Sequence, residues 1–242
     1  MVSDGQSHPR ITVAEHVQSL AAVRARIAEA ERRFGRAAGA VSLIAVSKGF
    51  PPADIRALAA AGQLAFGESY LSEAAPKMTA LADLSLEWHF LGPLQANKTR
   101  LIAERFAWVH SVDRLRIAER LSAQRPAGTP PLQICVQVNI SGEATKSGIA
   151  PDQASALLRV VARLPRLLVR GLMTIPAPSS DFETQYRAFR RLADLRDRLA
   201  SPDLPLDTLS MGMSADLEAA IAAGSTCVRV GTALFGVRAS FG

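Results

Sequence analysis

Eight short apolar runs alternate with segments of helical periodicity, and this alternation constrains the fold more than any other feature of the chain. The runs are rich in branched residues, as buried strands are, and they occupy residues 41–47, 64–68, 86–92, 107–112, 132–140, 167–175, 208–212 and 227–231. A helix after every strand predicts a parallel sheet with helices outside it. Eight such units predict a closed (β/α)8 TIM barrel. An open doubly wound sheet is the alternative. No G-x-G-x-x-G follows the first run, which disfavours a dinucleotide-binding site.

An amphipathic helix is predicted before the first run, over residues 13–33. The chain has 242 residues, a length that single α/β barrels reach, and its connections are short, with no evident linker. We therefore expect one domain over residues 13–242 and a disordered polar tail over residues 1–12. Asp113 and Ser214 are expected to cap the helices that follow the fourth and seventh runs.

Composition excludes several classes of protein. No apolar run approaches the length of a membrane span, and the polar N-terminus does not resemble a secretory signal. Cys135 and Cys227 both lie in apolar runs, which favours buried, reduced thiols in a cytoplasmic protein. The net charge of +6 comes from arginines spread over several helices, so a solvated surface explains it better than a nucleic-acid site. We expect neither a nucleic acid nor a membrane as a partner.

Lys48 directly follows the first apolar run. In a parallel barrel the active face lies at the carboxyl ends of the strands, so this lysine is expected at the barrel mouth. Low-dielectric walls disfavour the charged amine and lower its pKa. A neutral lysine amine is the nucleophile that forms an imine with an aldehyde. The alternative is a lysine that simply points to water.

The seventh and eighth runs end in groups suited to a phosphate. Ser214 follows the seventh run, and Gly231 with Thr232 follows the eighth. Barrel enzymes often bind phosphate in these two loops. Because the eighth strand of a closed barrel neighbours the first, these residues are expected beside Lys48. Arg229, two residues before Gly231, would share their side of the strand and needs a polar partner.

An imine-forming lysine, an arginine and a phosphate site together suit a flat phosphorylated aldehyde. Pyridoxal 5′-phosphate (PLP) is the first candidate and a phosphosugar the second. No Cys, His or carboxylate cluster has metal-ligand spacing, so no metal is expected. His89 and His110 are expected to be structural, and Glu68 is expected to form an ion pair at a strand end.

Six segments of the chain resemble the YggS/PROSC family of PLP-binding homeostasis proteins. They are AVSK (45–48), FGESY (66–70), EWHFLGPLQANKTR (87–100), GLMTIPAP (171–178), LSMGMSADLEAAIAAGST (209–226) and VRVGTALFG (228–236). The resemblance runs from about residue 13 to residue 237. It implies the barrel of PLP fold type III, as in alanine racemase, without the second β-domain of the racemases.

The resemblance also implies the cofactor-binding residues. Lys48 would carry PLP as a Schiff base, and Arg229 would face the pyridine nitrogen. The phosphate would be held by Ser214, Gly231 and Thr232, with the backbone of Met213 nearby. Val46 and Met173 would line the ring pocket. Family members usually have FGENY where this chain has FGESY, so Ser69 replaces an asparagine near the ring, and a water could bridge the shorter side chain.

A permanently charged arginine beside the pyridine nitrogen disfavours its protonation and weakens the ring as an electron sink. The leading prediction is therefore a monomeric PLP carrier in vitamin B6 homeostasis, with little catalysis, which passes PLP transiently to apoenzymes. The first alternative is a PLP-dependent amino-acid racemase, which needs a second acid/base such as Tyr70; a packing or surface role is preferred for this tyrosine. The second alternative is a Schiff-base phosphosugar aldolase, which would be colourless.

Overall fold

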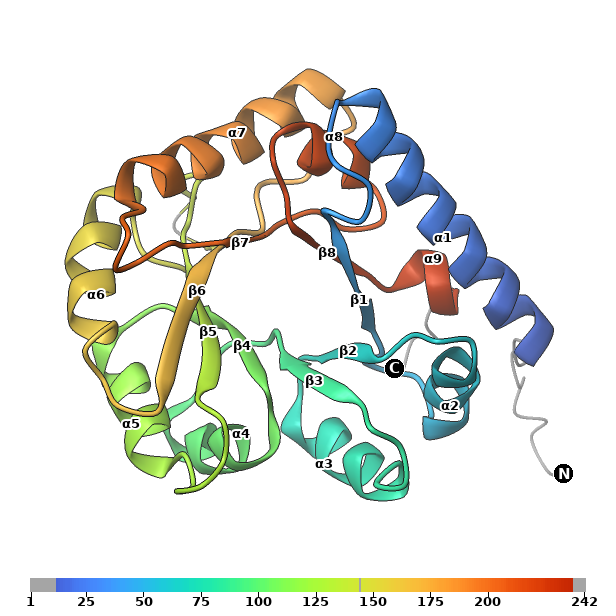
Figure 1. Cartoon of the computed structure of the whole chain (residues 1–242), viewed down its shortest axis with the longest axis horizontal. Coiled ribbons are helices and arrows are strands. Elements are labelled where there is room, and N and C mark those ends of the chain that lie inside the picture. The colour runs from blue at the N-terminus through green and yellow to red at the C-terminus, as the bar shows by residue number, and fades with distance from the viewer. Residues whose placement is uncertain (1–11, 144, 237–242) are drawn as a thin grey trace, which may run out of the picture.

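The strands of this protein form a closed parallel barrel. The computed structural model describes residues 12–143 and 145–236. Its strands are β1 (Ser42–Val46), β2 (Ala65–Glu68), β3 (Glu87–Phe90), β4 (Trp108–Val112), β5 (Leu132–Gln137), β6 (Leu167–Met173), β7 (Thr208–Ser210) and β8 (Cys227–Val230). Each strand pairs with the next in sequence, and β8 pairs in parallel with β1, which closes the ring (Figure 1). The barrel prediction is confirmed, and the open sheet is excluded.

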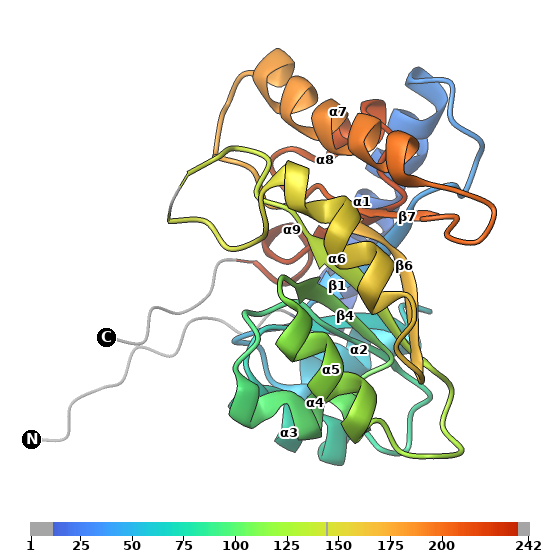
Figure 2. The same ribbon diagram turned by 90° about the vertical axis from the view of Figure 1, so that its left-hand side faces the viewer.

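The helices surround this ring. They are α1 (Val13–Arg33), α2 (Pro52–Ala60), α3 (Leu71–Ala80), α4 (Thr99–Arg105), α5 (Leu115–Gln124), α6 (Ala154–Val161), α7 (Phe182–Leu199), α8 (Leu217–Ala222) and α9 (Thr232–Phe235). Short 3-10 turns at Ala96–Lys98 and Pro151–Gln153 precede α4 and α6. Figures 1 and 2 show them outside the strands, as a parallel sheet requires to bury both of its faces. No helix in the described part of the chain is long and apolar enough to cross a membrane.

The helix predicted over residues 13–33 has these bounds in the structure, as α1. Thr12 caps it: its hydroxyl accepts from the backbone N–H of Glu15, and the Glu15 carboxylate accepts from the backbone N–H of Thr12. The buried face of α1 packs against α2, α8 and α9. Apart from Thr12, the tail predicted over residues 1–12 lies outside the described residues.

Two predicted helix caps are wrong. Helix α5 begins at Leu115, and the Asp113 carboxylate accepts from the side chain of its neighbour Arg114 instead of from the helix. Helix α8 begins only at Leu217, because the chain first makes a turn in which the Met213 N–H donates to the Asp216 carboxylate over 2.6 Å. This turn leaves Ser214 outside the helix and beside the barrel mouth.

Candidate functional site

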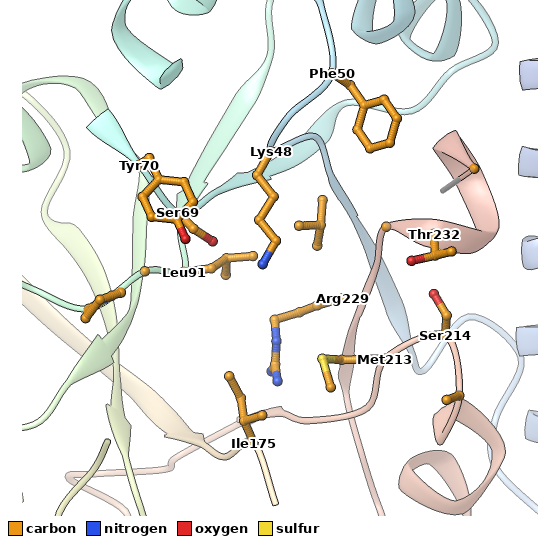
Figure 3. A pocket seen from close by; sticks show the side chains of 16 residues that line it. Lys48, Phe50, Ser69, Tyr70, Leu91, Ile175, Met213, Ser214, Arg229 and Thr232 are labelled. Carbon is orange, nitrogen blue, oxygen red and sulfur yellow. The ribbon is translucent and has the colours of Figure 1, made fainter. Parts of the chain in front are cut away.

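A cavity of about 450 Å³ lies at the carboxyl ends of the strands (Figure 3). Its lining comes from the carboxyl ends of β1 and β8 and from the segments that follow β1, β2, β3, β6, β7 and β8. Eight of the nine residues predicted for the site line it, and they are Val46, Lys48, Ser69, Met213, Ser214, Arg229, Gly231 and Thr232. The barrel therefore brings together side chains that are up to 186 positions apart (232 − 46).

Lys48 lies just beyond β1 and is half-buried. The backbone on both sides of it is held by side chains of α3. The Lys77 ammonium donates to the carbonyl of Ser47 over 2.8 Å, and the Glu73 carboxylate accepts from the N–H of Gly49 over 2.6 Å. These bonds fix the segment from which the Lys48 side chain extends into the cavity (Figure 3).

A buried ion pair between Glu68 and Lys77 contacts the segment next to Lys48. Glu68, at the end of β2, is fully buried, and one carboxylate oxygen accepts from the Lys77 ammonium over 2.8 Å and from the Ser47 hydroxyl over 2.7 Å. Burial raises the pKa of the Glu68 carboxyl, and Lys77 and Ser47 partly offset this. The prediction of an ion pair at Glu68 is confirmed.

Arg229 projects from β8 toward the base of the cavity, where Figure 3 shows it next to Met213. Its side chain is 4% exposed, and its guanidinium donates to the Ser210 hydroxyl over 2.6 Å and to the Thr174 carbonyl over 2.9 Å. Burial lowers the pKa of the guanidinium, but arginine keeps its proton in proteins. The guanidinium therefore keeps its positive charge in the cavity, and the two groups that accept its hydrogen bonds are neutral.

Two hydroxyls meet on the other side of the cavity. The side chains of Ser214 and Thr232 lie next to one another in Figure 3, with the Ser214 hydroxyl directed toward Thr232. The backbone carbonyl of Ser214 accepts from Arg26 of α1 over 3.2 Å, and its hydroxyl accepts from the N–H of Ala233 over 3.4 Å. At Gly231 a Cβ would lie only 3.3 Å from the carbonyl oxygen of Val46, so the missing side chain lets this loop approach β1.

The charged residues described in the cavity lining are all basic. Lys48 and Arg229 both line the cavity, whereas none of the described lining residues is acidic. A permanent guanidinium charge, a lysine amine and two hydroxyls within low-dielectric walls favour an anionic ligand. Among the described residues, no group of three or more His, Cys, Asp or Glu side chains could hold a metal ion.

Met173 does not line the cavity: it is 1% exposed within β6, and Ile175, two residues further, lines the cavity instead. Phe50 also lines the cavity and stacks on Phe235, with ring centroids 4.8 Å apart. Tyr70 lies at the rim and is 54% exposed. Sequence reasoning preferred a packing or surface role for Tyr70 and did not single out Ile175, because an apolar residue after a strand carries no distinctive signal.

Comparisons with known proteins agree with this geometry. Residues 18–239 match the family model described as the N-terminal domain of alanine racemase. A pyridoxal phosphate homeostasis protein of Pseudomonas aeruginosa is 58% identical over 227 residues, which cover 94% of this chain and 96% of that protein. The chain belongs to the pyridoxal phosphate homeostasis protein family.

Solved structures are also similar to this chain. PipY of Synechococcus elongatus, determined with PLP bound, is 38% identical with a TM-score of 0.80, and the match covers 91% of this chain and 100% of that one. An alanine racemase of Corynebacterium glutamicum is 19% identical with a TM-score of 0.66, and the match covers 62% of that chain. At this level of identity, the similarity to the racemase shows a shared fold and nothing more.

Proposed function

We propose that this protein binds PLP in the cavity, held covalently through Lys48, and that it serves PLP homeostasis with little catalysis. The observation that carries the proposal is that one cavity contains the lysine, the buried arginine and the two hydroxyls, with no acidic side chain among the described lining residues. The family names and the PLP-bound PipY structure support it.

The cavity residues fit this cofactor. A volume of about 450 Å³ lies within the range of small-molecule sites. The amine of Lys48 would hold the aldehyde as a Schiff base, and the hydroxyls of Ser214 and Thr232 with the loop at Gly231 would hold the phosphate. Val46, Ser69 and Met213 would flank the ring.

Arg229 limits the chemistry of the site. When bound, PLP supplies an electron-accepting ring, whose power depends on the charge near its pyridine nitrogen. A permanent cation there disfavours protonation of that nitrogen, so the site would stabilise carbanions weakly. This argument favours a carrier over an aminotransferase.

Exposure of the cavity rim also suits a carrier. Tyr70, Ile175 and Met213 are 54%, 37% and 38% exposed. A rim of this kind leaves the cavity accessible to solvent, and PLP could enter and leave without local unfolding.

The test is an absorption spectrum of the purified protein after incubation with PLP, before and after borohydride, followed by peptide mass mapping. We expect a visible band that borohydride removes, with the added mass on Lys48. Lys48→Ala should abolish the band, while Lys98→Ala on the exposed surface should retain it. A wild-type protein that stays colourless and unmodified would refute the proposal and favour the phosphosugar aldolase.

A racemase is the second candidate, because Tyr70 and Lys48 line the same cavity. A tyrosine there could act as a second acid/base. Exchange of the α-proton of an amino acid in deuterated water distinguishes the two functions. Rapid exchange that Tyr70→Phe abolishes would favour the racemase, and its absence in a PLP-loaded protein would favour the carrier.

A further inference from the structure

A chain of buried polar side chains crosses the barrel interior from Arg229 to the opposite end. Ser210 of β7 accepts from the Arg229 guanidinium and lies 2.8 Å from Nδ1 of His110 on β4. Nε2 of His110 lies 2.9 Å from Nδ1 of His89 on β3, and Nε2 of His89 lies 2.9 Å from the Glu87 carboxylate. Glu87 is the first residue of β3, so this row of hydrogen-bonded side chains connects the two ends of the barrel.

The Glu87 end fixes the direction of the hydrogen bonds along this row of side chains. Both histidines are buried, and burial favours the neutral imidazole, which carries one proton. An ionised carboxylate can only accept, so His89 donates from Nε2 to Glu87 and accepts at Nδ1. His110 then donates from Nε2 to His89 and accepts at its own Nδ1, to which the Ser210 hydroxyl directs its proton. The Ser210 oxygen keeps its lone pairs to accept from Arg229.

Burial reinforces this arrangement. His110 and Ser210 are fully buried, and His89 is 4% exposed. Burial lowers the pKa of both histidines, and Arg229 lowers that of His110 further. The bond to His89 lowers the pKa of the Glu87 carboxyl, which keeps the final acceptor ionised. A second cavity, of about 550 Å³, is lined by Glu87, His89 and His110 at the amino-terminal ends of the strands.

We propose that His110 is a positioning residue for Arg229, acting through Ser210, and that Glu87 and His89 impose its tautomer from the far end of the barrel. A Ser210 hydroxyl that directs its proton to His110 presents a lone pair to the guanidinium. Arg229 is thereby held at the base of the cavity by a neutral acceptor, without a carboxylate that would cancel its charge. The consequence for PLP rests on the proposed function.

The decisive variant is Glu87→Lys. The ammonium of the introduced side chain can only donate, so the direction of the hydrogen bonds between these side chains would reverse. Both histidines would carry the proton on Nδ1, and Ser210 could no longer direct its proton to His110. Glu87 is an exposed residue, which makes the substitution tolerable for the fold. Glu104→Lys is the matched control, because Glu104 is an exposed residue of α4 and the charge change is the same.

The first measurement needs no PLP. NMR of 15N-labelled protein reports the tautomer of each histidine and the Nε–H signal of Arg229. We expect Nε2-protonated His89 and His110 in the wild type and in Glu104→Lys. In Glu87→Lys we expect Nδ1-protonated rings and a shifted Arg229 signal. A proton on Nδ1 of His110 in the wild type, or an Arg229 signal unchanged in Glu87→Lys, would overturn the proposal.

The second measurement is the dissociation constant for PLP and the absorption maximum of the bound form. Glu87→Lys should bind PLP about tenfold more weakly and with a shifted maximum, whereas Glu104→Lys should match the wild type. If the tautomers reverse while affinity and spectrum stay unchanged, the chain does not position Arg229 for the ligand. If the wild type binds no PLP, the proposed function fails, and the histidine and arginine signals still decide the positioning role.

Discussion

Removing the ammonium of Lys77 should destabilise the protein more than any surface substitution. In Lys77→Met the fully buried Glu68 carboxylate loses its counter-charge, and the Ser47 carbonyl loses a donor. Breaking a buried pair from one side costs about 3–5 kcal/mol. Since 1 kcal/mol shifts Tm by about 2–4 °C in a chain of this size, Tm should fall by roughly 6–20 °C.

This loss should depend on pH. Burial raises the folded-state pKa of Glu68, and the variant lacks the lysine that offsets the rise. Between the unfolded and the folded pKa the native state holds a proton that the unfolded chain has released. Stability therefore falls as pH rises through this window, and the deficit of Lys77→Met should shrink toward acid pH.

Urea denaturation followed by circular dichroism, at several pH values, measures the effect. The double variant Glu68→Gln/Lys77→Met should recover most of the loss, because no charge is left buried. Lys98→Met is the matched control on the exposed surface and should change stability by less than about 0.5 kcal/mol. A loss below about 1 kcal/mol in Lys77→Met, or a double variant no more stable than the single one, would refute this electrostatic reasoning.

Two further predictions concern the barrel itself. Gly171→Ala should cost more than about 4 kcal/mol in urea titrations, because its Cβ would lie 1.7 Å from the Thr208 carbonyl oxygen of β7. Gly35→Ala, in open space at φ +64°, should cost only about 1–2 kcal/mol, and an equal loss would argue against the clash. Burial raises the pKa of both Cys135 and Cys227, so neither thiol should react with a chromogenic disulfide until urea unfolds the chain; fast reaction of the native protein would contradict this.

The sequence predicted the barrel because each strand is a contiguous apolar run and each following segment has helical spacing. Helix α1 has the predicted bounds. Several strands are shorter than their apolar runs: β5 ends at Gln137, although the run continues to residue 140. An apolar run marks burial, and burial continues past the last strand residue as the chain enters the barrel mouth.

The lining of the cavity was predicted where a polar or glycine residue closely follows a strand, as at Lys48 and Thr232, and the role of these residues toward PLP stays a prediction. The prediction of the lining failed where a position depended on the local path of the chain. Met173 is the last residue of β6 and is 1% exposed, and Ile175, two residues beyond the strand, lines the cavity instead. Ser214 reaches the mouth as predicted, but as part of a turn and not as a helix cap. Such local paths depend on tertiary contacts that a single sequence does not reveal.

Lys48 and Arg229, the two basic residues described in the cavity lining, are both held in place by groups that do not line it. Lys48 extends from a backbone segment clamped by Lys77 and Glu73 of α3. Arg229 is held by Ser210, at the end of the chain that begins at the far end of the barrel. In both cases the carboxylates lie outside the cavity lining. The proposed function would use this separation: the permanent charge of Arg229 attracts an anionic aldehyde, and none of the described lining residues is acidic and would repel it.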